Sequence, residues 1–521
     1  MARAKKARRS QRQQEPAAQA AVETRRERIP PLAKLLLACA VVVALFALRR
    51  IFLPLPWSYD EYYHLGLARE MLSGLRIESF RWTPFSILFD HFVDSAPLFH
   101  LLLMPIARLP LETAAFLGAL FGQLFLVGSF AWALWSLRVP RPWWFVLALP
   151  ALGTLFAHRV GMCRPQVWLI GSSVLVIALL VERRWKALFV VCALFGLTHT
   201  AGWISIPLAL LWSLSGLVVR GEPAGRRIPW QPVAAAAGGW LLGQLVHPEV
   251  PANFRLFFIS NFVIPFQATA AGDAALRTQL GTELSPPGLD LLLEQWPALV
   301  APALVAFALL FQPRLRSRAT LTAGAVALAF FLAGSLFARR FLELGTPLAL
   351  LALALVLRER RDQGLPPLLP NWGRMLAAAG IVLGTLWTAA ALRTYDVGKA
   401  SPPREMARWL GEHGAPGERV FTAQWADSSP LFYSAPQLQS LVALDPTVFY
   451  AKDPQLFQTY VNIVQGRHPD PARAIRERFG ARWVTIWKQP VHKPLALQLS
   501  RSPGVRVAFN DYHYLVMDLR P

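Results

Sequence analysis

Long runs of Leu, Ala, Val and Phe with almost no charge alternate along most of this chain with short polar segments. A helix needs roughly 20 apolar residues to cross a hydrocarbon core about 30 Å thick. The runs therefore predict a polytopic α-helical membrane protein. We expect eleven spans, at about 31–48, 111–137, 142–157, 165–181, 186–200, 201–219, 230–247, 296–312, 319–337, 341–357 and 374–392.

Basic clusters between the apolar runs indicate how the spans are oriented, because Lys and Arg favour the cytoplasmic side. If 96–109 lies along the outer surface without crossing, every second connection is basic, the N-terminus is cytoplasmic and the C-terminus is outside. The two segments between 186 and 219 are short for a bilayer, and an even total of spans would move the C-terminus to the cytoplasm. We expect the plasma (inner) membrane as the location. The cytoplasmic clusters are Arg138 and Arg141; Arg183, Arg184 and Lys186; Arg220, Arg226 and Arg227; Arg314, Arg316 and Arg318; and Arg358, Arg360 and Arg361.

Changes in composition divide the chain into three regions. Residues 1–30 are basic and poor in apolar side chains, which predicts a disordered cytoplasmic tail. Residues 31–392 form the transmembrane domain, with a first outer loop at 54–110. In residues 393–521 charges occur throughout, which predicts a soluble extracytoplasmic α/β domain. Its expected elements are helix 402–413, strand 419–424, helix 471–479, strand 482–487 and a terminal hairpin of 505–510 and 512–518.

Composition also excludes some classes of protein. The chain has 521 residues, is 54% hydrophobic and carries a formal net charge of +22. Its Lys and Arg residues follow the positive-inside pattern, so we expect membrane lipids and no nucleic acid as partners. Three cysteines without paired spacing support neither a disulfide framework nor a zinc site.

Two adjacent carboxylates follow the first span, in the segment Ser58-Tyr59-Asp60-Glu61. Ser58 and Glu61 have the spacing of a helix capping box, which places both acids in the first turn of a helix, where the dipole favours their ionised form. We expect this helix to lie on the membrane surface with its acids facing water. Asp60 and His64 then lie one turn apart on one face. An ionised carboxylate here could accept the proton of a hydroxyl, whereas a plain helix-start acid would have no such task.

Other ionisable residues gather on the same outer side of the membrane. Adjacent arginines at 339 and 340 run against the positive-inside bias, and an anionic lipid phosphate would be a suitable partner. We expect His199 to be a core residue bonded to neighbouring hydroxyls. No cofactor is required by the sequence. A divalent metal near Asp90, His91 and Asp94 remains an alternative without diagnostic ligand spacing, so its ligands are unknown. The outer groups also include His158, Arg159, Arg164 and Glu343.

Four passages resemble the GT-C superfamily of membrane glycosyltransferases, especially its protein mannosyltransferase and aminoarabinose transferase branch, which uses polyprenyl-phosphate sugars. YDEYYHLGLAREMLSG (59–74) looks like that family's acidic pair opening a helix. SAPLFHLLLMPIARL (95–109) is similar to its Pro-Pro-Leu-Tyr segment, with Ala96 for the first proline and Ser95 for a frequent lysine. CRPQVW (163–168) is similar to its Arg-Pro-acid motif, with Gln166 where an acid is common. ARRFLELGTPLALLALA (338–354) is similar to a late Arg-aromatic segment.

The resemblance implies catalysis outside the membrane, with Asp60 as the base and Glu61 as its neighbour. It makes Arg164 and either Arg339 or Arg340 candidates for the donor phosphate. The substitution at Gln166 leaves a second acid unassigned, with Asp90 and Asp94 as possible replacements. We also expect His64 and Asp94 among the substrate-binding residues. The tail is similar to the external domains of such enzymes, and residues 424–427 (QWAD) weakly resemble the Trp-Trp-Asp motif of oligosaccharyltransferases.

We therefore expect a membrane glycosyltransferase that moves a sugar from a polyprenyl-phosphate donor to an extracytoplasmic acceptor hydroxyl on a lipid, glycan or protein. One alternative is an oligosaccharyltransferase or glycan ligase with a polyprenyl diphosphate donor, which sensitivity to chelators would separate. A lipid or solute transporter is a second alternative, although it should carry charged relays inside its spans. A third alternative is a non-catalytic scaffold, which would tolerate alanine at Asp60 and Arg164.

Overall fold

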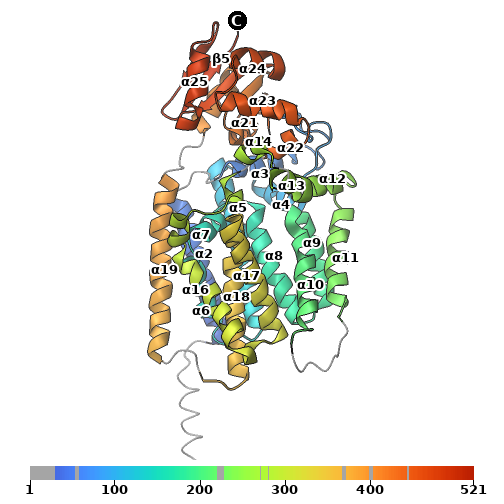
Figure 1. Ribbon diagram of the computed structural model, residues 1–521, viewed down its shortest axis with the longest axis vertical. Helices are drawn as coiled ribbons and strands as arrows, with labels where there is room; N and C mark the ends of the chain where they lie inside the picture. Colours follow the sequence, from blue (N-terminus) through green and yellow to red (C-terminus); the bar gives the residue numbers. More distant parts are fainter. Residues whose placement is uncertain are drawn as a thin grey trace, which may run out of the picture.

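Most of the chain forms a bundle of upright helices, and a smaller region containing a β-sheet lies over one end of this bundle (Figure 1). The computed structural model describes residues 30–52, 58–219, 228–269, 272–279, 281–366, 371–397, 403–442 and 445–520. The predicted disordered tail at 1–30 lies outside these ranges, except for Pro30.

Five helices in the described part of the chain are long and apolar enough to cross a membrane, or six if one bent pair counts as a broken span. The first member of that pair is Trp143–Ala151, which contains α6 (Trp143–Leu147), and the second is α7 (Thr154–Val160). The two members meet at a bend of 101°. The long helices are α2 (Pro31–Phe52), α5 (Leu111–Ser136), α17 (Arg318–Leu336), α18 (Arg340–Asp362) and α19 (Asn371–Val397). Shorter helices complete the bundle: α8 (Pro165–Val181), α9 (Trp185–Thr198), α10 (Ser205–Ser215), α11 (Gln231–Leu245) and α16 (Trp296–Phe311).

Each apolar segment expected from the sequence thus corresponds to a helix or to the bent pair. The number of helices that cross the bilayer, and the side on which each end lies, stay predictions. The segment 96–109 contains only α4 (Pro97–Leu103) and a three-residue 3-10 turn, which is too short to span a membrane. This agrees with the expectation that it does not cross.

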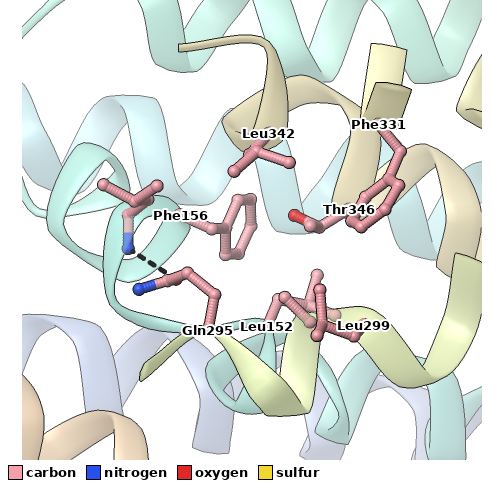
Figure 2. A pocket seen from close by; sticks show the side chains of 9 residues that line it. Leu152, Phe156, Gln295, Leu299, Phe331, Leu342 and Thr346 are labelled. Atoms are coloured by element: carbon pink, nitrogen blue, oxygen red, sulfur yellow. Dashed lines mark hydrogen bonds between the residues drawn. The ribbon is translucent and has the colours of Figure 1, made fainter. Parts of the chain in front are cut away.

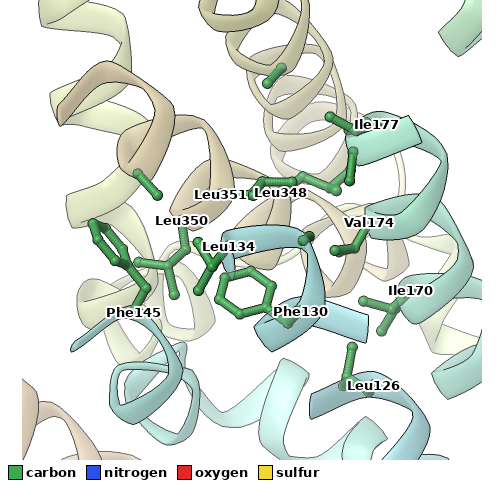
Figure 3. Close-up of a cluster of buried hydrophobic side chains, with 14 of the residues drawn as sticks. Leu126, Phe130, Leu134, Phe145, Ile170, Val174, Ile177, Leu348, Leu350 and Leu351 are labelled. Carbon is green, nitrogen blue, oxygen red and sulfur yellow. The ribbon is translucent and has the colours of Figure 1, made fainter. Parts of the chain in front are cut away.

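Helices α5, α8 and α18 pack at the centre of the bundle. Side chains such as Phe130, Val174 and Leu351 meet there with no access to solvent (Figure 3). Because lipid tails are as apolar as these side chains, close van der Waals contact holds such helices together. Gly345 illustrates this close approach, since a Cβ atom at this position would lie 3.0 Å from the backbone nitrogen of Phe331 on α17.

Short helices lie between the bundle and the sheet region (Figure 1). Two come from the first outer loop, α3 (Tyr59–Glu70) and α4. The others come from the long connection between α11 and α16: α12 (Ala252–Phe258), α13 (Ile264–Thr269) and α14 (Ala274–Gln279). The same connection ends with α15 (Leu289–Glu294), whose last carbonyl accepts a hydrogen bond from Trp387 of α19.

The C-terminal region contains a five-stranded sheet in the order β2-β1-β3-β5-β4. Strand β1 pairs in parallel with β2 and β3, whereas β5 is antiparallel to both β3 and β4. Both predicted helix–strand units and the terminal hairpin are present. The strands are β1 (Arg419–Thr422), β2 (Gln439–Ser440), β3 (Ala481–Trp487), β4 (Arg506–Asn510) and β5 (Tyr514–Asp518); the helices are α20 (Arg404–His413), α21 (Ser428–Ser434), α22 (Thr447–Tyr450), α23 (Pro454–Val464), α24 (Pro471–Phe479) and α25 (Lys493–Ser500).

Candidate active site

Helix α3 begins at the acidic pair, as the sequence predicts, but the capping box is only half formed. The Ser58 hydroxyl accepts a hydrogen bond from the Asp60 N–H at 3.1 Å. The Glu61 carboxylate is bound instead to Arg50 and to the Cys163 N–H. The predicted surface position is also wrong for most of this helix, since residues 61–68 are all buried. The physical reason is that α3 packs against α4 and α5 and is covered by α21.

Glu61 binds Arg50, which lies in the last turn of α2. The two guanidinium Nη atoms donate to the two carboxylate oxygens at 3.0 and 2.8 Å, and both side chains are fully buried. The Cys163 N–H donates to the same carboxylate at 2.7 Å, and Arg50 also donates to the Gly161 carbonyl at 3.1 Å. Glu61 therefore connects α3 to α2 and to the turn before α8. This contact gives the buried guanidinium of Arg50, in the last turn of the first apolar helix, a carboxylate partner.

Asp60 forms an ion pair with Arg164, and both side chains are largely buried at 15% and 12% exposure. Arg164 precedes Pro165, which favours the extended backbone observed at this position and directs the arginine away from α8. Burial raises the pKa of Asp60 against the opposing effect of Arg164, and the negative charge of Glu283 raises it further. A carboxylate with a raised pKa is a stronger base than an ordinary aspartate.

Glu283 is an acid of this site that sequence reasoning missed. Its carboxylate accepts a hydrogen bond from Arg159 at 2.6 Å and lies 3.9 Å from Arg164. Burial would raise the pKa of Glu283, but Arg159, Arg164 and Arg340 together hold it well below its usual range. The only signal in the sequence was an acid within the long connection before α16. The sequence offered Asp90 and Asp94 in place of the acid missing at Gln166. Neither of them lies where Glu283 does, between Arg159 and Arg164.

Arg159 reaches the site because the span that carries it is broken. Its guanidinium also binds Glu343 of α18, with Nε 2.5 Å from one carboxylate oxygen. The break lies at Gly153, whose positive φ of 88° suits glycine. Beyond it, Gln295 accepts a hydrogen bond from the Leu155 N–H at 3.1 Å and closes the first turn of α7 (Figure 2). The bend thus turns the end of α7 toward Glu283.

Arg340 is a half-buried cation at the first position of α18. Within the ranges that the structure describes, its side chain makes no hydrogen bond or ion pair, although its positive charge acts on Glu283, His199 and Asp445. Its neighbour Arg339 donates its backbone N–H to the Ser285 carbonyl. Arg340 therefore retains donors that an anion could use.

His199 lies closer to this charge cluster than the sequence suggested. It follows α9 directly, and its Nδ1 accepts a hydrogen bond from the Ala201 N–H at 2.9 Å. The predicted bonds to the hydroxyls of Thr198 and Thr200 are replaced by this contact. The charges of Arg340 and Arg164 both act on its ring. His199 is buried, as expected of a core histidine, and it also lies within reach of the charges of this cluster.

The remaining predicted residues separate into two groups. Asp94 and His64 are buried, and His100 of α4 lies within hydrogen-bond distance of both. His64 lies one turn along α3 from Asp60. Asp90 instead lies at the surface, where it pairs with Lys452 at 3.3 Å. Among the described residues, no three His, Cys, Asp or Glu side chains converge as a metal site would require. A metal near Asp90, His91 and Asp94 therefore has no ligand cluster in that part of the chain.

The QWAD segment contributes a contact to α3. Asp427 is fully buried, and one of its carboxylate oxygens accepts a hydrogen bond from the Tyr514 hydroxyl at 3.0 Å. The Tyr514 hydroxyl lies 3.3 Å from that of Tyr59, the first residue of α3. This aspartate therefore supports the N-terminus of the helix that carries Asp60.

No protein-family model and no curated protein matches the sequence. Among solved structures, the chain is similar to ArnT from Cupriavidus metallidurans in the apo state, with a TM-score of 0.51 and 16% identity. The match covers 93% of this chain and 97% of that one. ArnT is an aminoarabinose transferase of the GT-C family.

The chain has the fold of this ArnT structure. The fold class predicted from the sequence, a polytopic helical membrane protein with a C-terminal α/β region, is thereby confirmed. The resemblance to the aminoarabinose transferase branch is also confirmed at the level of the fold. In this fold the charge cluster of Asp60, Arg164, Glu283 and Arg340 lies where the bundle meets the sheet region.

Proposed function

We propose that this protein is an integral membrane glycosyltransferase that moves a sugar from a polyprenyl-phosphate donor to an extracytoplasmic acceptor hydroxyl. The proposal rests on one observation: Asp60, a largely buried carboxylate with a raised pKa, is ion-paired with Arg164. Arg164 and Arg340 both act on Glu283, and Arg340 makes no ion pair within the described residues. A base that shares a charge cluster with an available cation suits a reaction in which a hydroxyl loses its proton and a phosphate leaves. The likeness to ArnT supports this class of reaction.

The donor phosphate would be bound by Arg164 and Arg340. The Nε atom of Arg164 is buried and has no hydrogen-bond acceptor among the residues that the structure describes, so one donor of its fork is unused there. Arginine stays charged and offers planar paired donors, which match the oxygens of a phosphate. Arg159 is already occupied by Glu343 and Glu283, so we assign it to hold Glu283 in place.

The reaction would be a single displacement. The acceptor oxygen forms a bond to the anomeric carbon while its proton passes to Asp60. The bond from that carbon to the phosphate oxygen breaks, and its electron pair remains on the departing phosphate. The two arginines stabilise this developing negative charge, and the configuration at the anomeric carbon inverts.

Glu61 has a different task in this proposal from the catalytic one that its position beside Asp60 suggested. Both of its oxygens are occupied by Arg50, and no part of it reaches solvent. We therefore assign Glu61 to holding α3 in position. Asp60 alone of the acidic pair would meet substrate.

The test is transfer of radiolabelled sugar from a panel of polyprenyl-phosphate donors to a broad acceptor mixture by protein purified in detergent. Asp60→Asn keeps the shape of the side chain but cannot accept the proton, so transfer should fall by roughly 100-fold or more. Asp290→Asn is the matched control, because Asp290 also occupies the second position of a helix but is exposed. Transfer at the native rate by Asp60→Asn would refute the base. Transfer from diphosphate donors alone, abolished by a chelator, would favour the ligase; no transfer from any donor would favour a transporter.

A further inference from the structure

The C-terminal region contributes an acid to the charge cluster. Asp445 lies just before α22, at the edge of the sheet region that faces the bundle (Figure 1). The five residues that follow it are all buried, whereas Asp445 is exposed. Its charge acts on Asp60, and the charges of Arg340 and Glu283 act on it. The mechanism proposed above gives this carboxylate no task.

One buried cluster joins the helices that follow Asp445 and Asp60. Val448 of α22 and Tyr63 of α3 both belong to this cluster. Asp445 precedes Val448 by three residues, and Asp60 precedes Tyr63 by three residues. The Ile87 N–H also donates to the Val448 carbonyl at 3.1 Å, which fixes α22 to the first outer loop. The two acids therefore precede helices that are packed together.

Helix α22 is fixed on another side to the connection that carries Glu283. The Tyr450 hydroxyl donates to Asp273, the residue before α14, at 2.9 Å. Tyr450 also shares a buried cluster with Leu276 of α14. Glu283 follows shortly after the end of α14. The start of α22 is thus held by both of the elements that bring acids to the cluster.

The Asp445 carboxylate has acceptor positions to spare. Its Oδ1 accepts the Thr447 N–H at 2.8 Å, and within the described ranges all of its hydrogen-bond donors belong to Thr447. No lysine or arginine of the described residues forms an ion pair with it. Since two carboxylate oxygens offer about four acceptor positions, Asp445 can accept further hydrogen bonds.

Asp445 lines a recess and not the outer surface. Burial raises the pKa of Asp445, and the hydrogen bonds from Thr447 and the charge of Arg340 oppose this effect. A carboxylate on an open surface would feel no such effect of burial, because water would solvate it fully. Asp445 is therefore open to solvent and at the same time surrounded by protein, as a substrate-binding side chain is.

We propose that Asp445 accepts hydrogen bonds from hydroxyl groups of the transferred sugar and so selects which sugar is moved. The inference rests on the proposed function, in which Arg340 binds the donor phosphate and Asp60 meets the acceptor hydroxyl. In a single displacement the anomeric carbon lies between those two groups. A side chain that shares a cluster with both then lies beside the sugar ring.

The charge of Asp445 favours the sugar over the donor phosphate as its ligand. Two anions repel each other, and Arg164 and Arg340 already supply cations for the phosphate. Sugar hydroxyls can donate, and one carboxylate can accept from two neighbouring hydroxyls at once. A hydrogen bond to a charged group changes an equilibrium constant by roughly 10- to 100-fold. Such a contact is strong enough to distinguish one sugar from another.

The test combines Asp445→Ala with donors that lack single hydroxyl groups. The probes are the polyprenyl-phosphate hexose or pentose that the native protein in detergent uses fastest, and its monodeoxy analogues. Removing a contacted hydroxyl should lower native kcat/KM by roughly 10-fold or more. Asp445→Ala should lose a similar factor with the complete donor and lose no more when that hydroxyl is absent. The other hydroxyls should cost the same in both proteins.

Asp445→Asn keeps the fold and removes only the charge. Its amide oxygen can still accept the Thr447 N–H, so the turn before α22 is preserved. The loss with the complete donor should be smaller than for Asp445→Ala. Asp453→Asn is the matched control, because Asp453 also accepts a backbone N–H at the start of a helix, α23, and asparagine can keep that bond. This control should keep native kinetics with every donor.

The outcomes separate this inference from the function on which it rests. Equal penalties for every missing hydroxyl in native protein and Asp445→Ala would overturn the role of Asp445 and leave the glycosyltransferase intact. A change in the acceptor KM alone would overturn it as well. If unfolding in detergent shows that Asp445→Ala is misfolded, the same comparison with Asp445→Asn decides. No transfer by native protein from any donor would instead overturn the proposed function, and this inference with it.

Discussion

Arg50 and Glu61 face each other where α2 meets α3, and neither side chain is accessible to solvent. Their two hydrogen bonds, 3.0 and 2.8 Å long, connect the first apolar helix to the helix that carries Asp60. Removing one member of such a pair leaves an uncompensated buried charge, which costs about 3–5 kcal/mol. Replacing both members removes that penalty.

We therefore expect Glu61→Gln and Arg50→Met each to lower the free energy of unfolding by about 3–5 kcal/mol, and the double variant to lose less than the sum. Thermal and denaturant unfolding in detergent measures all three proteins. Additive losses in the double-mutant cycle would show that the two charges do not depend on each other.

Arg340 should matter for the donor and not for stability, because its side chain makes no hydrogen bond or ion pair among the described residues. Arg340→Gln should lower kcat/KM for the donor by roughly 100-fold, and Arg340→Lys should recover only part of it, since lysine lacks the planar fork. Arg361→Gln, at the exposed far end of the same helix, is the matched control. Equal kinetics for Arg340→Gln and Arg361→Gln would exclude Arg340 from the phosphate site.

Gly66 allows α21 to lie directly against α3. A Cβ atom at this position would come within 2.8 Å of the Phe432 ring. Gly66→Ala should therefore destabilise the protein by about 1–3 kcal/mol, despite the better helix propensity of alanine, and should reduce transfer by displacing Asp60. Gly128→Ala in α5 is the control, because its Cβ would meet nothing within 4 Å. Unfolding in detergent and the transfer assay measure both effects. If the ring of Phe432 simply moves aside, Gly66→Ala will keep the native stability and this prediction will be wrong.

Asp427 should make stability depend on pH. Burial raises the pKa of Asp427 to about 8, although the hydrogen bond from Tyr514 opposes this effect. In the unfolded chain the same group has a pKa of about 3.9. Between these values the folded state holds a proton that the unfolded state has lost, so stability falls as pH rises from about 4 to about 8.

Asp427→Asn removes this titration. The melting temperature of the variant relative to the native protein should therefore rise with pH across the same window and stay level outside it. The comparison needs only melting curves over a series of buffers. The exposed Asp290→Asn variant should show no such trend, and a constant difference between Asp427→Asn and native protein would mean that Asp427 is ionised in the folded state.

The sequence predicted the apolar helices and the helix–strand units well, because each depends on local patterns. The expected span at 165–181 coincides with α8, and the hairpin of 505–518 with β4 and β5. It also indicated Asp60 and Arg164, which the structure joins in one ion pair. The prediction for Glu61 was wrong, because its carboxylate binds the buried Arg50 and does not cap the helix. Glu283 was not predicted at all, because no motif surrounds it.

Apolar periodicity and charge along the chain alone determined that this is a helical membrane protein with a separate α/β region and an acidic pair at the start of a helix. Only the tertiary structure decided which charges meet. Arg50, Arg159 and Glu283 come from segments far apart in the sequence, and their partners are selected by how the helices pack and by where α7 bends. Burial then makes those partners necessary, because a charge without one costs too much where water cannot reach it.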